Sequence, residues 1–146
     1  MIKILIVDDS LTARAVLSHL LEQDPEITVM GFATDGRQAV EMAGKLKPDL
    51  ITMDIEMPDM NGLEATRLIM AERPIPIVIV TGHANSPKLN VAFEAMKAGA
   101  LEVIPKPAGF GEEEDGIWGE KVLARIKDLA GIEPRAIADL GSRNAE

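Results

Sequence analysis

Residues 50–58 read LITMDIEMP, an apolar run that stops at the carboxylate of Asp54. A continuous apolar run bounded by turn residues is typical of a strand that is buried on both faces of a sheet. Pro58, Asn61 and Gly62 then favour a loop. Ligands of open α/β sheets bind at the carboxyl ends of the strands, so this stretch predicts that any chemistry lies around Asp54.

Three other short apolar runs also end beside polar or charged residues. They are residues 4–7 with Asp8 and Asp9, residues 77–80 with Thr81, and residues 101–104 with Lys106. The carboxyl ends of parallel strands meet at the same edge of a sheet. We therefore expect these side chains to converge on Asp54.

Strand and helix patterns alternate five times with short connections. The predicted strands cover residues 2–7, 27–33, 50–54, 77–80 and 101–104, and the predicted helices cover 11–23, 37–46, 61–72, 87–98 and 118–129. This alternation predicts an α/β fold, a flavodoxin-like doubly wound sheet of five parallel strands in the order 2-1-3-4-5, with five helices. We expect residues 1–130 to form the domain, residues 105–116 a loop, and residues 131–146 a linker or loosely attached tail.

Composition excludes several classes of function. The chain has no cysteine, which rules out disulfides, thiol catalysis and cysteine metal sites. No apolar run approaches the roughly 20 residues that cross a bilayer, and no signal peptide is evident, so a cytoplasmic protein with no membrane partner is predicted. The net charge of −9 argues against direct nucleic-acid binding.

The converging carboxylates need a compensating cation. Two unit charges about 4 Å apart repel by roughly 4 kcal/mol at an effective dielectric constant near 20. An all-oxygen site suits Mg²⁺, and Lys106 and Thr81 supply a positive charge and a hydroxyl for a phosphoryl group. Asp54 is then the predicted nucleophile, which takes that group as an acyl phosphate.

With these residues in place, the chain resembles the receiver domains of two-component response regulators. The matching motifs are Asp8-Asp9-Ser10, Asp54-Ile55-Glu56-Met57-Pro58 with Asn61-Gly62, Thr81-Gly82, Gly99-Ala100 and Lys106-Pro107. The resemblance implies that a sensor histidine kinase phosphorylates Asp54 and that Thr81 and Lys106 hold the phosphoryl group. It also implies Mg²⁺ bound by Asp9, Asp54 and the backbone carbonyl of Glu56, with Asp8 acting through water.

The resemblance extends to tuning and switch positions. Glu56 and His83 occupy positions that often tune phosphoryl loss in this family, although exposed loop side chains explain them equally well. Thr81 is a switch residue of the family, and its partner position, usually Tyr or Phe, is Val103 here, which puts the aromatic part of the switch in doubt. An output domain or partner protein is expected to bind the face formed by residues 87–98, 101–104 and 118–129.

Within the family, the chain is most similar to the receiver domain of the chemotaxis methylesterase. Residues 52–58, 63–67 and 104–107 carry this likeness, which suggests a role in chemotaxis. An esterase needs a catalytic triad in a second domain. We expect that the chain ends before such a domain and acts as a signalling module, either alone or separated from its output module.

Three other functions compete with this one. A flavodoxin-like cofactor carrier needs a loop of phosphate-binding backbone donors after the first strand, where Asp8 and Asp9 would repel phosphate. A Mg²⁺-dependent phosphohydrolase shares the aspartyl-phosphate chemistry, but needs a substrate pocket and a dedicated acid–base residue. A receiver that never takes a phosphoryl group would have no use for the complete set of acids, Thr81 and Lys106.

Overall fold

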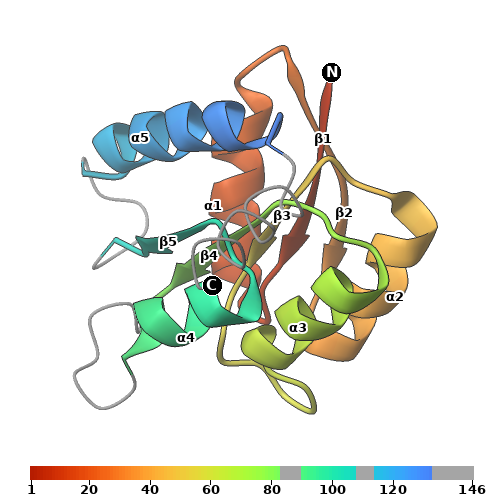
Figure 1. Cartoon of the computed structure of the whole chain (residues 1–146). Helices are drawn as coiled ribbons and strands as arrows, with labels where there is room; N and C mark the ends of the chain where they lie inside the picture. Colours follow the sequence, from red (N-terminus) through yellow and green to blue (C-terminus); the bar gives the residue numbers. More distant parts are fainter. Residues whose placement is uncertain (83–89, 108–113, 133–146) are drawn as a thin grey trace, which may run out of the picture.

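The computed structural model describes residues 1–82, 90–107 and 114–132, and the whole chain is traced in Figure 1. Within these ranges the strands are β1 (Ile2–Val7), β2 (Ile27–Ala33), β3 (Leu50–Met53), β4 (Ile77–Thr81) and β5 (Glu102–Pro105). The helices are α1 (Leu11–Glu22), α2 (Gly36–Leu46), α3 (Gly62–Glu72), α4 (Val91–Ala98) and α5 (Glu114–Leu129). None of the described helices is both long enough and apolar enough to span a membrane.

The strands form one parallel sheet in the order β2-β1-β3-β4-β5, which confirms the predicted topology. Strand β1 lies next to β3, and their last residues, Val7 and Met53, are register partners. The residues that follow these two strands therefore leave the sheet side by side. This is the crossover point at which doubly wound sheets bind ligands.

The sheet separates two hydrophobic cores, because successive strand residues point to opposite faces. In β1, Leu5 and Val7 pack in the core that contains buried residues of α2, α3 and α4. Ile4 and Ile6 pack in the other core, with buried residues of α1 and α5. The two sets of helices cover opposite faces of the sheet (Figure 1).

Side-chain caps start the helices that flank the carboxyl edge. The Ser10 hydroxyl accepts a hydrogen bond from the Ala13 amide at 3.2 Å, and the Asn61 side chain accepts one from the Glu64 amide at 3.0 Å. Ser and Asn are favoured at this position because their side-chain oxygens accept hydrogen bonds from the free amides of the first helical turn. The two caps fix where the chain turns after β1 and after the loop that follows Asp54.

Helix α5 corrects one prediction. Residues 105–116 were expected to form a loop, but the helix begins at Glu114. Residues 112–115 are all acidic in the sequence. Acidic residues are favoured in the first turn of a helix, where they interact with the positive end of its dipole, so an acidic run is compatible with a helix start. The predicted start of the fourth helix at Pro87 and most of the predicted tail fall in 83–89 and 133–146, outside the described residues.

Candidate functional site

Asp54 is the first residue after β3, and the sheet fixes its position. Its amide donates a hydrogen bond to the Val7 carbonyl at 2.9 Å, which continues the pairing of β3 with β1 by one residue. The Ile55 amide donates to Asp54 Oδ1 at 2.9 Å. Only 6% of Asp54 is exposed, so this carboxylate lies in a largely buried position.

Asp8 is the first residue after β1 and is more deeply buried, with 1% exposure. The Ser10 amide donates to Asp8 Oδ1 at 2.9 Å, and Arg14 Nη1 donates to the Asp8 carbonyl at 2.8 Å. Asp9, the next residue, is exposed. The contacts from Ser10 and Arg14 were not predicted, because the sequence does not show how the chain turns between β1 and α1.

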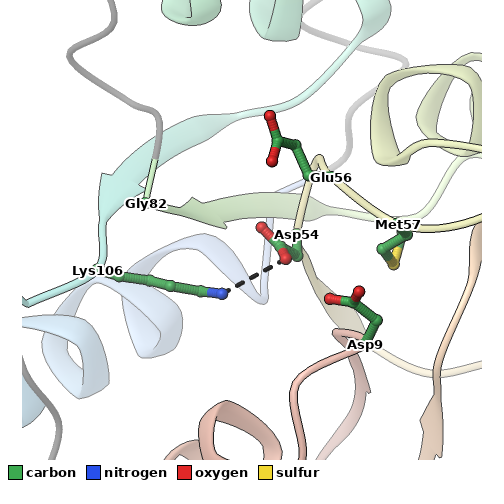
Figure 2. Close-up of a pocket in the computed structure, with 6 residues that line it drawn as sticks. All are labelled: Asp9, Asp54, Glu56, Met57, Gly82 and Lys106. Atoms are coloured by element: carbon green, nitrogen blue, oxygen red, sulfur yellow. Dashed lines mark ion pairs between the residues drawn. The ribbon is translucent and has the colours of Figure 1, made fainter.

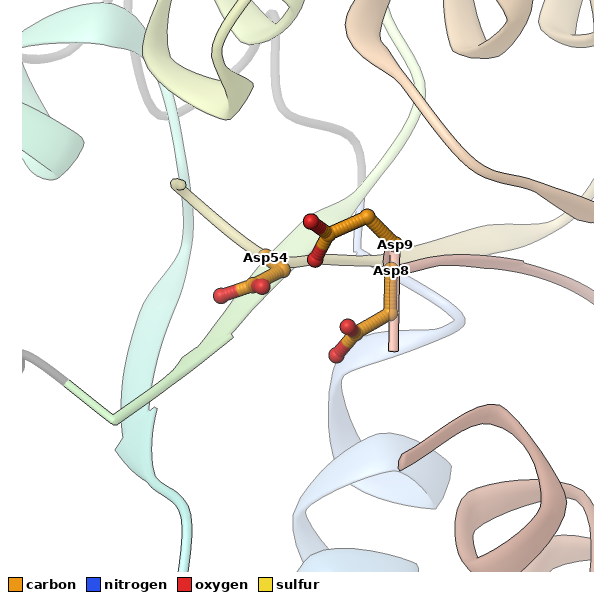
Figure 3. Close-up of side chains that lie close together, drawn as sticks. All are labelled: Asp8, Asp9 and Asp54. Atoms are coloured by element: carbon orange, nitrogen blue, oxygen red, sulfur yellow. The ribbon is translucent and has the colours of Figure 1, made fainter. Parts of the chain in front are cut away.

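The three acids converge as predicted. Asp8, Asp9 and Asp54 each offer a carboxylate oxygen, and these oxygens lie within 4.8 Å of one another. Figure 3 shows Asp8 and Asp9 leaving consecutive positions of the chain, with their carboxylates on the side of Asp54. The site thus concentrates negative charge at the end of two adjacent strands.

Lys106 follows β5 and reaches the same place from the other side. Its amide donates to the Thr81 carbonyl at 3.0 Å, which fixes its backbone beside β4. Its Nζ lies 2.8 Å from Asp8 Oδ2 and 3.4 Å from Asp54 Oδ2. Figure 2 shows the side chain extended toward Asp54. The sequence predicted Lys106 at the site, but not that its shorter contact is with Asp8.

An open cavity of about 470 Å³ borders Asp54 and Lys106 (Figure 2). Its lining consists of Asp9, Asp54, Glu56, Met57, Gly82 and Lys106. Met57 and Gly82 were not predicted to line it. A space of this size, open to solvent and rimmed by charged groups, can admit a phosphoryl group with its donor.

The other predicted residues lie further from the cavity or outside the described chain. Thr81 is fully buried at the end of β4 and is not part of the cavity lining. Val103 is partly buried and packs in the core beneath α2, α3 and α4. His83 lies outside the described residues, so its tuning role stays a prediction.

The electrostatics of the site reflect this crowding. The pKa of Asp54 is raised to about 6: burial raises it most, the negative charge of Asp8 also raises it, and Lys106 and the Ile55 amide partly oppose both effects. Burial alone would lower the pKa of Lys106. The hydrogen bond to Asp8 and the charges of Asp54 and Asp8 outweigh burial, so the pKa of Lys106 is raised and its ammonium form is favoured.

The raised pKa of Asp54 predicts a pH-dependent stability. The native state binds this proton more tightly than the unfolded state, whose carboxyl has its ordinary pKa of 3.8, so stability falls as pH rises through about 4 to 6. Asp54→Asn removes that penalty. In EDTA at about pH 8, we expect the variant to be more stable than the wild type by about 1–2 kcal/mol, after allowance for solvent screening.

Urea unfolding at several pH values measures this difference. The advantage of Asp54→Asn should shrink as pH falls from about 6 to about 4, because the wild-type carboxyl becomes protonated in the native state over this range. Glu72→Gln changes an exposed acid of α3 in the same way and is the control, which should not stabilise the protein at about pH 8. A variant less stable than the wild type at about pH 8 would contradict the electrostatic description of the site.

The acids also fit a hard divalent cation. Octahedral Mg²⁺ with bonds of about 2.1 Å separates its ligand oxygens by roughly 3–4 Å. The oxygens of Asp8, Asp9 and Asp54 lie within 4.8 Å of one another, which is close to this spacing. The Glu56 carbonyl follows directly after Ile55, in the loop that borders the cavity. This is an acidic group of the kind at which receiver domains bind Mg²⁺.

Comparison with known proteins decides the family. The model of the response regulator receiver domain matches residues 4–114. The chain belongs to this receiver family. The receiver domain of Thermotoga maritima CheB has the same fold, with a TM-score of 0.84, 39% identity, and coverage of 92% of this chain and 99% of that one. A receiver domain is a signalling module, which confirms the class of function predicted from the motifs.

Curated relatives of this receiver are larger proteins. The protein-glutamate methylesterase/protein-glutamine glutaminase of Nitrosospira multiformis is 42% identical over 91% of this chain. A protein of the same name from Syntrophus aciditrophicus is 49% identical over 91% of the chain. The chain spans 38% of the length of each relative. These findings confirm the predicted likeness to methylesterase receivers.

Proposed function

We propose that Asp54 accepts a phosphoryl group from a sensor histidine kinase and that Mg²⁺ is required for the transfer. The observation that carries this proposal is the geometry at one edge of the sheet. There the Asp54 carboxylate lies within reach of Lys106 Nζ, at 3.4 Å, and of the oxygens of Asp8 and Asp9. A nucleophile, a cation and a set of metal ligands meet beside an open cavity.

The transfer exchanges one bond to phosphorus for another. An Asp54 oxygen attacks the phosphorus atom of a phosphohistidine, a P–O bond forms, and the P–N bond to the imidazole breaks with its electron pair returning to nitrogen. Asp54 has to be ionised to attack, and bound Mg²⁺ would favour that ionised form, because a nearby positive charge lowers the pKa of a carboxyl group. The Lys106 ammonium group pairs with the Asp54 carboxylate before the transfer and can stabilise the negative charge of the phosphoryl oxygens after it.

The proposed metal ligands are Asp9, Asp54 and the Glu56 carbonyl, with Asp8 acting through water. When bound, Mg²⁺ supplies positive charge that offsets the acids and the incoming phosphoryl oxygens. A receiver domain of a sensor histidine kinase from Pseudomonas aeruginosa, with 25% identity and a TM-score of 0.71, was solved with a magnesium ion in its active-site cleft. That likeness supports the choice of metal.

The output and context of the signal are part of the proposal. The relatives are named as methylesterases, which supports an output domain of that kind, or a separate partner protein, in chemotaxis. The proposed contact surface is the face of α4, β5 and α5, with Thr81 as a switch residue. We propose residues 1–130 as the receiver domain, 131–146 as a linker or loosely attached tail, and the cytoplasm as the location.

Thermal unfolding with Mg²⁺ and beryllofluoride, a phosphoryl analogue, tests this function in two steps. Mg²⁺ at about ten times its dissociation constant should raise the midpoint by about 4 °C, because a ligand that binds only the native state stabilises it. Beryllofluoride should raise the midpoint further by completing the coordination at Asp54. Both increments should be measurable on the same sample.

Variants assign the two increments to residues. Asp9→Ala should lose most of the Mg²⁺ increment. Asp54→Asn alters a proposed metal ligand and the beryllofluoride acceptor, so it should lose the beryllofluoride increment and reduce the Mg²⁺ increment. Glu72→Ala removes an exposed acid far from the site and should keep both. A wild-type midpoint that responds to neither addition would exclude the proposed site.

A further inference from the structure

The peptide group between Pro105 and Lys106 is held from both sides. Its N–H, that of Lys106, donates to the Thr81 carbonyl at 3.0 Å, and its C=O, that of Pro105, accepts from Trp118 Nε1 at 2.7 Å. A peptide group is planar, so two hydrogen bonds at its opposite ends fix its orientation between β4 and α5. That orientation sets the direction in which the Lys106 side chain leaves the backbone.

Helix α5, which carries Trp118, is held against the rest of the domain at both ends. Gly119 packs so closely on α1 that an added Cβ would lie 2.8 Å from Leu20 Cδ2. Near the other end of the helix, Lys127 Nζ lies 2.9 Å from carboxylate oxygens of both Asp24 and Glu26. Trp118 therefore joins an anchored helix to the residue that precedes Lys106.

Val103 lies on the other face of the sheet from this contact. Val103 packs in the core beneath α2, α3 and α4, whereas Trp118 packs in the core beneath α1 and α5. Valine has a single stiff side-chain torsion and no ring that could change position. A connection between the site and α5 through Trp118 does not depend on residue 103.

We propose that Trp118 is a positioning residue for Lys106, and that its indole N–H connects α5 to the phosphoryl site. The inference rests on the proposed role of Lys106 at Asp54. Loss of the hydrogen bond lets the Pro105–Lys106 peptide rotate and weakens the approach of Nζ to Asp8 and Asp54. One neutral hydrogen bond changes an equilibrium constant by about fivefold, which sets the size of the expected effects.

A double-mutant cycle in EDTA tests the positioning of Lys106. Trp118→Phe keeps an aromatic ring and removes the N–H donor, and Lys106→Met removes the ammonium group. If Trp118 positions Lys106, the fold-change in the unfolding constant caused by Trp118→Phe should be about three times smaller when residue 106 is already Met. Leu123→Val, a packing change on the same helix, should be additive with Lys106→Met. Additive behaviour of Trp118→Phe would overturn the inference.

Fluorine NMR of beryllofluoride bound with Mg²⁺ gives a second readout. Trp118→Phe should weaken the apparent affinity about fivefold, and Leu123→Val should leave it unchanged. Wild-type affinity in Trp118→Phe would overturn the inference. Failure of the wild type to bind beryllofluoride would instead overturn the proposed function, and the double-mutant cycle would still decide whether Trp118 positions Lys106.

Discussion

Lys106→Met is expected to destabilise the protein in EDTA by about 3 kcal/mol, since removing one partner of a buried ion pair leaves an uncompensated charge. The Lys106 side chain is 15% exposed and lies beside the Asp8 and Asp54 carboxylates, which are nearly buried. Without the ammonium group these two acids repel each other in a poorly hydrated position. Mg²⁺ should return much of the lost stability, because it supplies the missing positive charge.

Lys127→Met is the matched control for this prediction. Lys127 also pairs with two carboxylates, each at 2.9 Å, but its side chain is 39% exposed. Exposed ion pairs contribute little to stability, so this variant should lose much less stability than Lys106→Met and should not gain from Mg²⁺ more than the wild type does. Urea unfolding with and without Mg²⁺ measures both variants. Equal losses would show that burial does not set the energetics of the site.

Gly62→Ala is expected to cost about 3 kcal/mol, because its methyl group has no space. An added Cβ would lie far inside contact distance of the Asp54 carbonyl oxygen, and 2.9 Å from the carbonyl carbon. These are backbone atoms, so no side-chain rotation can relieve the clash. The Asp54–Ile55 peptide would have to move, together with the hydrogen bond from the Gly62 amide to the Ile55 carbonyl at 2.8 Å.

The same variant should also weaken Mg²⁺ binding, because the displaced peptide carries the Asp54 carboxylate and precedes Glu56. Gly44→Ala is the control: it lies in α2, and nothing is within 4 Å of an added Cβ. It should stabilise the protein by about 0.5–1 kcal/mol through helix propensity. Thermal unfolding and Mg²⁺ titration compare the two, and a neutral effect of Gly62→Ala would contradict the described loop geometry.

The sheet and the acidic cluster could be predicted because their signals are local in the sequence. Parallel strands that are buried on both faces appear as continuous apolar runs, and β3 and β4 are such runs. The residues that directly follow the strands lie at the carboxyl edge of the sheet, so the strand order determines which of them are neighbours. The sequence therefore predicts that Asp8, Asp54 and Lys106 lie together, and the structure places them so.

The remaining details depend on tertiary contacts that leave no pattern in the sequence. Trp118 packs against the core beneath α1 and α5, but helical periodicity does not show that its N–H meets the Pro105 carbonyl. Gly62 appeared to be a turn glycine, whereas its constraint comes from the backbone of Asp54 pressing against the start of α3. The early start of α5 was missed because an acidic run suits both a loop and a first helical turn.

Covalent labelling with acetyl phosphate tests the central claim most directly. Intact mass should show one added phosphoryl group in Mg²⁺ and none in EDTA or in Asp54→Asn. Borohydride reduction of the acyl phosphate to an alcohol, followed by peptide mapping, should place the modification at Asp54. A phosphoryl group at another residue, or equal incorporation in Asp54→Asn, would contradict the account.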